Sequence, residues 1–340
     1  MTDVLCLGEI LVDWISTTPG IELHEAEVFT KAAGGAPANT AVSLARQGIN
    51  TAFLGRVATD NFGLWLQQLL HQEQIDTSGL VLDPEAQTRM AYIVTSENGE
   101  RKVCGFSTIA CADARFSASD LLEHMFEQAS LMHFGSISLI AAPTSEATKQ
   151  AIQWAHKHQV LLSFDPNVRL DLWPTAEHCR QTIIDTLPLV DVVKISENEL
   201  EFLTGSQSPD AAQALRKQFD IPLLIITLGS GGAHAFHASG HQKVNSFQVE
   251  LVEDTGAGDG FNSGTIAALL PFIRKQNRAD ALPRAILQSL NLEDIVKIIT
   301  RANAVGALTC TQKGAIPALP YAEQVDTFLR GLVSASPGSS

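Results

Sequence analysis

The alternation of short apolar runs with longer amphipathic stretches is the feature that most constrains how this chain can fold. Five runs are apolar along nearly their whole length, and we predict that they form buried strands: 4–8, 131–135, 160–165, 190–195 and 223–228. Unbroken apolar runs are typical of parallel sheets, in which both faces are covered. The stretches with helical periodicity are 36–47, 61–73, 119–128, 144–158, 176–186 and 210–219. This order predicts an α/β fold, with a doubly wound, mostly parallel sheet flanked by helices.

Two segments do not follow this alternation. Residues 89–95 and 100–106 resemble the two strands of a β-hairpin with Asn98 and Gly99 at the turn, and residues 14–31 lack helical periodicity. Strands outside a doubly wound core could form a small lid that excludes water from an active site, or a decorative hairpin on the surface. The residues alone leave both interpretations open.

Length and composition indicate one large domain or a main domain with an appendage, since 45% of the 340 residues are hydrophobic. We expect this domain to span 1–333, with a β-sheet lid from about 14–32 and 88–110. The remaining residues, 334–340, are small and polar and are expected to form a flexible tail.

Charge and cysteine content narrow the setting and the partners. The net charge of −14 argues against nucleic acid and anionic membranes as partners, so an anionic substrate would need local donors. The five cysteines show no pairing pattern, no basic leader is present, and no apolar run reaches membrane-spanning length. These features predict a cytoplasmic protein with free thiols.

A glycine-rich turn at 254–264 combines a carboxylate with the start of an apolar helix. Gly256 and Gly258 allow backbone angles that turn consecutive N–H groups toward one point, and the helix adds the positive end of its dipole there. Asp259 lies at the junction, where it could take a proton from a hydroxyl that attacks a bound phosphate. A plain helix entry with an Asp in its first turn is the alternative.

A second glycine-rich segment at 34–48 also leads into a helix. Gly34 and Gly35 permit close approach of the backbone to a ligand, which favours a ligand contact, although Asn39 could also be a capping residue. Asp13 follows the first strand, where it could accept two hydrogen bonds from sugar hydroxyls or serve as a turn residue.

Polar residues follow two further predicted strands, at the edge where open α/β sheets bind ligands. Arg169 could hold a phosphate or form a surface salt bridge. Ser196 and Glu199 have the spacing of a capping box, which predicts a structural role for Glu199. Asn198 and Glu201 remain as residues that could orient water around Mg²⁺.

The segment 227–232 leads from one strand into another, so it does not match the dinucleotide-binding fingerprint, in which a helix follows the glycines. It could be a backbone cradle for a nucleotide or a hairpin turn. The chain also lacks a P-loop motif, the Gly-x-Ser-x-Gly context of hydrolases around Ser136, and the histidine spacing of a zinc site.

Together these motifs resemble one family. The segments 34–48 and 254–270 resemble the two signatures of the PfkB-type (ribokinase-like) carbohydrate kinases, and 165–174, 196–201 and 227–232 fall in the order of that family. The resemblance covers 3–330, and the two signatures are specific. Within the family the chain looks most like the fructokinases.

The resemblance implies a role for each matching residue. Asp259 would be the catalytic base for the sugar hydroxyl, beside an anion hole formed by Gly256, Ala257 and Gly258. Arg169 would support the phosphoryl transition state. The sugar would be bound by Asp13, Gly34, Gly35, Asn39 and Asp259. The nucleotide would be bound by Asn198, Thr227, Gly229, Gly232, Gly258 and Asn303. Asn198 and Glu201 match the family's Asn-x-x-Glu motif, which is tied to Mg²⁺ through water.

The resemblance therefore implies a kinase that uses ATP and Mg²⁺ to convert fructose to fructose 6-phosphate. A kinase for another sugar or sugar acid, such as ribose or 2-keto-3-deoxygluconate, and a non-catalytic, sugar-sensing member of the fold are the alternatives. Family members usually carry Asp followed by Thr where this chain has Glu253 followed by Asp254. The resemblance implies a loop here that binds a monovalent cation such as K⁺, and this departure could alter it. Many fructokinases have a Phe-Tyr-Arg-like run on the lid, where this chain has Gly-Phe-Ser-Thr-Ile at 105–109. This difference leaves the choice of sugar open. The resemblance also suggests a homodimer formed through the lid strands.

Overall fold

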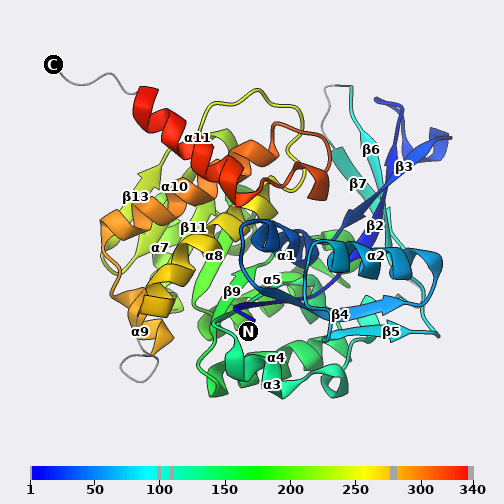
Figure 1. The fold of residues 1–340 in the computed structure, drawn as a ribbon, viewed down its shortest axis with the longest axis horizontal. Helices are drawn as coiled ribbons and strands as arrows, with labels where there is room; N and C mark the ends of the chain where they lie inside the picture. The colour runs from blue at the N-terminus through cyan, green and yellow to red at the C-terminus, as the bar shows by residue number, and fades with distance from the viewer. Residues whose placement is uncertain (1, 98–100, 108–110, 276–281, 336–340) are drawn as a thin grey trace.

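A nine-stranded sheet forms the centre of the molecule in the computed structural model, which describes residues 2–97, 101–107, 111–275 and 282–335 (Figure 1). Its strands, in spatial order, are β13 (Gly240–Val244), β12 (Ala233–His237), β11 (Leu223–Thr227), β10 (Val192–Ser196), β9 (Leu161–Asp165), β8 (Leu131–Gly135), β1 (Val4–Leu7), β4 (Thr51–Ala58) and β5 (Leu80–Asp83). Neighbouring strands from β11 to β5 are parallel, while β12 and β13 are antiparallel at one edge. The predicted α/β fold with a mostly parallel sheet is confirmed.

Helices cover both faces of this sheet. One face carries α1 (Ala36–Arg46), α2 (Asn61–Gln72), α8 (Ala257–Lys275) and α10 (Leu292–Thr309), with α9 (Pro283–Gln288) against α8 and α11 (Ala322–Ala335) against α10. The other face carries α3 (Glu123–Gln128), α4 (Thr144–Lys157), α5 (Ala176–Thr186), α6 (Glu197–Thr204) and α7 (Pro209–Gln218). In β1, Val4 and Cys6 join the apolar cluster on the first face, and Leu5 and Leu7 join the cluster on the second. Burial on both faces is why the strand sequences are apolar without alternation.

The helix expected over 119–128 was predicted too long. Residues 118–120 form a separate 3₁₀ turn, and the α-helix begins at Glu123. The turn is closed by a reciprocal cap between Ser117 and Asp120, and Leu121 then adopts an extended conformation, so one continuous helix cannot form. Strand β4 was not predicted, because Gly55 and Arg56 interrupt its apolar run.

A separate four-stranded sheet lies beside α1 and α2 (Figure 1). Its order is β3 (Phe29–Gly34), β2 (Leu11–Ser16), β6 (Met90–Thr95) and β7 (Arg101–Phe106). The predicted hairpin is present as the antiparallel pair β6–β7, although its Asn98-Gly99 turn lies outside the described residues. We call this sheet the lid. Most of the expected tail, 336–340, also lies outside the described residues.

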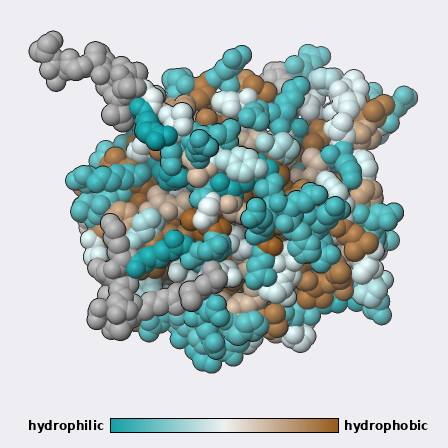
Figure 2. Space-filling model, viewed as in Figure 1, coloured by the Kyte–Doolittle hydropathy of each residue, from teal (hydrophilic) through white to brown (hydrophobic). Residues whose placement is uncertain are grey.

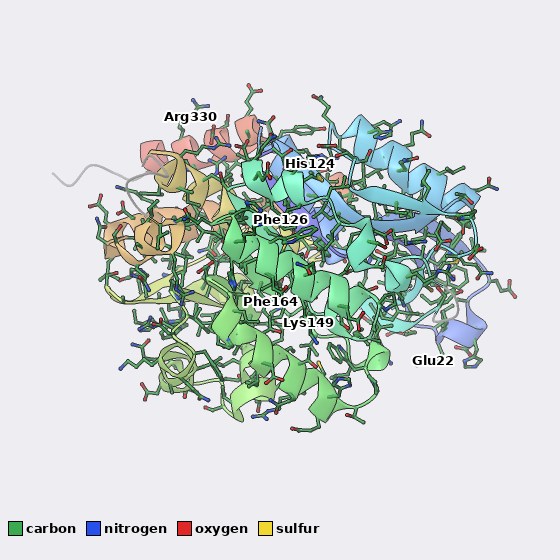
Figure 3. The ribbon with its side chains drawn as sticks, turned by 90° about the horizontal axis from the view of Figure 1, so that it is seen from below. Glu22, His124, Phe126, Lys149, Phe164 and Arg330 are labelled. Carbon is green, nitrogen blue, oxygen red and sulfur yellow. The ribbon has the colours of Figure 1, made fainter. Side chains whose placement is uncertain are left out.

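The buried centre and the exposed surface differ sharply in polarity. Phe164 of β9 is fully buried against Phe134 near the centre of the molecule, while Glu22, beside the lid strands, lies at its edge (Figure 3). On the face drawn in Figure 2, hydrophobic residues are interspersed with hydrophilic ones. Within the described part of the chain, no helix combines the length and the apolar character needed to cross a membrane.

Candidate active site

A cavity of about 900 Å³ lies between the lid and the carboxyl ends of strands β9 to β11. Lid residues that line it include Asp13, Ala91 and Arg101, and the first turn of α8 lines the side that faces them. The carboxyl ends of parallel strands are where open α/β sheets bind ligands. Because its residues form a wall of this cavity, the second sheet is a lid and not a surface decoration.

Asp259 projects from the first turn of α8 into the cavity, where Asn39 Nδ2 donates a 2.8 Å hydrogen bond to its Oδ2. Burial raises the pKa of Asp259 to about 6, and the hydrogen bond from Asn39 partly opposes that rise. A carboxylate with this pKa can accept a proton near neutral pH. The two glycine-rich segments therefore meet at one point, since Asn39 comes from the first and Asp259 from the second.

The turn before Asp259 depends on two glycines. Gly256 has φ 82°, and a Cβ there would lie 3.1 Å from Ala315. A Cβ on Gly258 would lie 3.2 Å from Nζ of Lys194. The first N–H groups of a helix have no acceptor within the helix, so Gly256 and Gly258 leave backbone donors at the start of α8. The N–H of Ala257, also expected in the anion hole, donates instead to the carbonyl oxygen of Asp254 at 3.0 Å. This arrangement can hold an anion beside Asp259.

Lys194 and Asp165 form a buried ion pair at this point, and sequence analysis gave neither a role. Lys194 Nζ lies 2.8 Å from Asp165 Oδ2, which also accepts a 2.7 Å hydrogen bond from Asn262 Nδ2. Burial alone would raise the pKa of Asp165, but Lys194 and Asn262 together hold it below its ordinary value. A lysine directly after the apolar residues 192–193 of a predicted buried strand was the available signal, because a buried lysine needs a carboxylate partner.

The expected sugar-binding residues Asp13, Gly34 and Gly35 lie where strands β2 and β3 meet the start of α1, which we call the lid hinge. Burial raises the pKa of Asp13 to about 6, and the charges of Arg101 and Arg169 oppose that rise. Gly34 does not line the cavity; a Cβ there would collide with the Asp13 carboxylate. Gly35 lines the cavity with φ 106°, and a Cβ there would lie 2.5 Å from the Glu9 carbonyl oxygen. Both glycines are required because other groups of the site fill the space beside them.

Arg169 lies in the cavity near two carboxylates and is not part of a salt bridge to any described residue. Its Nη1 donates to the carbonyl oxygen of Val168 at 2.9 Å, and its charge lowers the pKa of both Asp13 and Asp259. A surface salt bridge was the alternative expectation, and the structure does not show one. Arg169 is therefore free to bind an anionic group of a ligand.

The segment 227–232 is a hairpin turn that also lines the cavity. Thr227 ends β11, Gly229 has φ 54°, and Gly232 has φ 91° with no room for a Cβ beside Val244. Asn303 of α10 donates hydrogen bonds of 3.2 and 3.1 Å to the carbonyl oxygens of Val244 and Asn245. Asn303 thus holds the loop that follows β13 against the same end of the cavity.

The two residues expected near Mg²⁺ are placed differently from each other. Asn198 lines the cavity, but Glu201 does not, and the Glu201 carboxylate accepts a 2.8 Å hydrogen bond from Gln207. Glu201 lies almost one helical turn further along α6, away from the strand end. Glu199 forms the predicted capping box with Ser196.

Glu253 and Asp254 also have different surroundings. Glu253 forms a buried 2.9 Å salt bridge with Arg101 of the lid, whereas Asp254 lines the cavity. The residue that departs from the family pattern at 253 therefore connects the lid with the loop that precedes the anion hole.

The family model described as pfkB family carbohydrate kinase matches residues 1–322. The chain belongs to the pfkB family. Fructokinase-1 of Zea mays is 39% identical over 324 residues, which cover 95% of this chain and 96% of that protein. The chain is thus a carbohydrate kinase of this family, as the sequence predicted.

Two solved structures show the same fold. The fructokinase of Xylella fastidiosa with bound ATP matches with a TM-score of 0.85 and 31% identity, covering 97% of this chain and 99% of that chain. The fructokinase of Vibrio cholerae O395, solved with fructose, ADP and calcium ion, matches with a TM-score of 0.81 and 34% identity, again covering 97% and 99%.

Proposed function

We propose that this chain is an ATP-dependent fructokinase in which Asp259 is the general base. The observation that carries the proposal is the position of Asp259, which Asn39 fixes beside the N-terminus of α8 in a cavity that the lid lines on one side. Its pKa of about 6 lets it act as a base at neutral pH. Relatives named fructokinases, one of them solved with fructose and ADP, support the choice of sugar.

In the proposed reaction, fructose binds between Asp13 and Asp259 under the lid. Asp259 takes the proton of the 6-hydroxyl group while that oxygen forms a bond to the γ-phosphorus of ATP. The bond from this phosphorus to the bridging oxygen breaks, and ADP leaves. The N–H groups around Gly256–Gly258 and the guanidinium of Arg169 would stabilise the charge on the transferred phosphoryl group.

ATP would lie along the opposite end of the cavity from the lid hinge. Its proposed contacts are Asn198, Thr227, Gly229, Gly232, Gly258 and Asn303. Oxygen donors of Glu197, Asn198 and Asp254 line the same cavity, and they fit Mg²⁺ held through water. Mg²⁺ would neutralise negative charge on the phosphate oxygens. Glu201 is not included, because its side chain faces Gln207.

One observation favours a second candidate, a kinase for a sugar acid. Arg169 lines the cavity, its charge lowers the pKa of both Asp13 and Asp259, and it has no carboxylate partner at salt-bridge distance among the described residues. Arg169 could therefore bind the carboxylate of a sugar acid. A non-catalytic sugar sensor is disfavoured, since such a protein would not need a buried base beside an anion hole.

A panel of sugars in a coupled assay for ADP release tests the proposal. Fructose, ribose, glucose and 2-keto-3-deoxygluconate are compared at equal concentration with ATP and Mg²⁺. We expect the highest kcat/KM with fructose, together with fructose 6-phosphate as the product. Highest kcat/KM with the sugar acid would support the second candidate, and absence of ADP release with every sugar would contradict both.

A further inference from the structure

The proposed function leaves a buried cation at the anion hole unexplained. We infer that Lys194 is a further catalytic residue, whose ammonium group contacts the transferred phosphoryl group, and that Asp165 positions it. This inference rests on the proposed kinase function and adds to it a second source of positive charge.

The position of Nζ carries the first step. Lys194 is the third residue of β10, and its side chain lines the cavity. The distance of 3.2 Å from Nζ to a Cβ built on Gly258 places the ammonium group directly against the backbone of the anion hole. An anion held by the N–H groups of this turn would therefore touch the ammonium group as well. A side chain at position 258 would separate the two.

The hydrogen bonds of Lys194 carry the second step. An ammonium group has three N–H donors, and within the described chain one of them bonds to Asp165 at 2.8 Å. No other acceptor among the described residues lies within hydrogen-bond distance of Nζ, so two donors are available to a ligand in the cavity. Burial lowers the pKa of Lys194, but the charges of Asp165 and Glu199 raise it above its ordinary value, so the group stays charged.

The surroundings of Asp165 show how it positions the lysine. Asp165 Oδ2 accepts from Lys194 of β10 and from Asn262 of α8, the helix that carries Asp259. The carboxylate at the end of β9 therefore joins the middle of β10 to α8. The nearby His133 shares a 3.1 Å hydrogen bond with Ser163. Burial lowers the pKa of His133 to about 4, so its imidazole is neutral near pH 7. Lys194 is the charged partner that the carboxylate holds.

A buried ion pair could also be purely structural, and two variants separate these roles. Lys194→Met removes the ammonium group but leaves Asp165 unpaired, which destabilises the fold. The double variant Lys194→Met/Asp165→Leu removes both charges, and replacement of a whole buried ion pair by apolar residues is often neutral for stability. Lys217→Met, at an exposed position on α7, is the matched control.

The measurement is kcat and both KM values with the sugar that the panel identifies, together with Tm for each variant. We expect kcat to fall about 100-fold or more in both Lys194 variants, with the sugar KM changed less than about threefold, while Tm recovers in the double variant. A structural pair predicts the opposite result, in which kcat recovers along with Tm, and this would overturn the inference. A double variant that keeps kcat within about threefold of wild type at any Tm would overturn it too. Failure of the proposed function is seen separately, as absence of ADP release by the wild-type protein.

Discussion

The strands of the nine-stranded sheet and those of the lid differ in burial and in the residues that they contribute to the cavity. The strands of the large sheet are buried on both faces, and they hold Asp165 and Lys194 where side-chain motion is most restricted. The lid strands are partly exposed, and they contribute Asp13 and Arg101 to the same cavity. Under the proposed function, the buried sheet would fix groups that assist phosphoryl transfer, while the smaller sheet would supply groups that bind the sugar.

Several side-chain contacts join the lid to the rest of the described chain, among them the edge-to-face pair of Trp14 and Phe62 and two contacts that involve a charged lid residue. Arg101 of β7 pairs with Glu253 at 2.9 Å. On the other side of the lid, Lys31 Nζ lies 3.9 Å from the centre of the Trp65 ring on α2. Because these contacts are separate, each one can be removed alone, and the effects of removal can be ranked.

Among the changes within the lid, the largest effect is expected from the carboxylate Asp13. A hydrogen bond to a charged group contributes about 1.5–3 kcal/mol, so Asp13→Asn should raise the fructose KM about 10- to 100-fold. The ATP KM should change less than about twofold, because the proposed nucleotide contacts all lie outside the lid. Steady-state kinetics with both substrates varied provide the measurement, and Asp171→Asn, at an exposed position, is the control. Equal rises in both KM values would break the division between the two regions.

The pH dependence of kcat/KM tests whether the lid carboxylate Asp13 titrates together with Asp259 of α8. Burial raises the pKa of both Asp13 and Asp259 to about 6, and both are proposed to act when ionised. Activity should therefore be complete well above pH 6 and fall as the pH drops through 6, with two protonations giving a fall of up to about 100-fold per pH unit. Asp13→Asn should reduce this to about tenfold per unit. An unchanged slope in that variant would mean that the lid carboxylate does not titrate in this range.

A smaller effect is expected from the ion pair that joins lid and core. Arg101→Glu places like charges at a buried contact and should lower kcat/KM about tenfold, and the exchange Arg101→Glu/Glu253→Arg should restore part of the loss. The same exchange at Glu293 and Lys297, an exposed pair on α10, should have no effect. If the losses from Arg101→Glu and Glu253→Arg simply add, the pair does not couple the two regions.

The smallest effect is expected at Lys31. Loss of its cation–π contact with Trp65 should cost about 0.5–1 kcal/mol, so Lys31→Ala should speed amide exchange in β3 about two- to fivefold. Hydrogen exchange followed by mass spectrometry measures the exchange rate of the β3 amides, and Lys102→Ala, at an exposed position of β7, is the control. A similar change in the strands of the large sheet would show that the lid is not an independent unit.

The sequence was most informative where local rules decide the structure. The apolar runs predicted the central strands, and the glycines before Asp259 marked the turn that leads into α8. The meeting of Asn39 with Asp259 followed from family resemblance, since these residues lie 220 positions apart. Local spacing alone could not have placed them together.

The remaining parts depend on which elements become neighbours. Lys194 and Asp165 pair because β9 and β10 lie side by side, and the order of strands is a tertiary property. Glu201 matched a spacing, but its position along α6 turned it toward Gln207. The partner of Glu253 is on the lid, about 150 residues earlier in the chain, so no local pattern could reveal it.

The proposed reaction depends on Asp259 taking the proton of the sugar hydroxyl, and Asp259→Asn removes that step alone. The change keeps the size of the side chain and an oxygen that can accept from Asn39. Single-turnover phosphoryl transfer is measured by rapid quench, and fructose and ATP affinities are measured by calorimetry on the same preparation. We predict that transfer slows about 10²- to 10⁴-fold while both Kd values stay within about threefold of wild type. Transfer within about threefold of the wild-type rate would contradict the account.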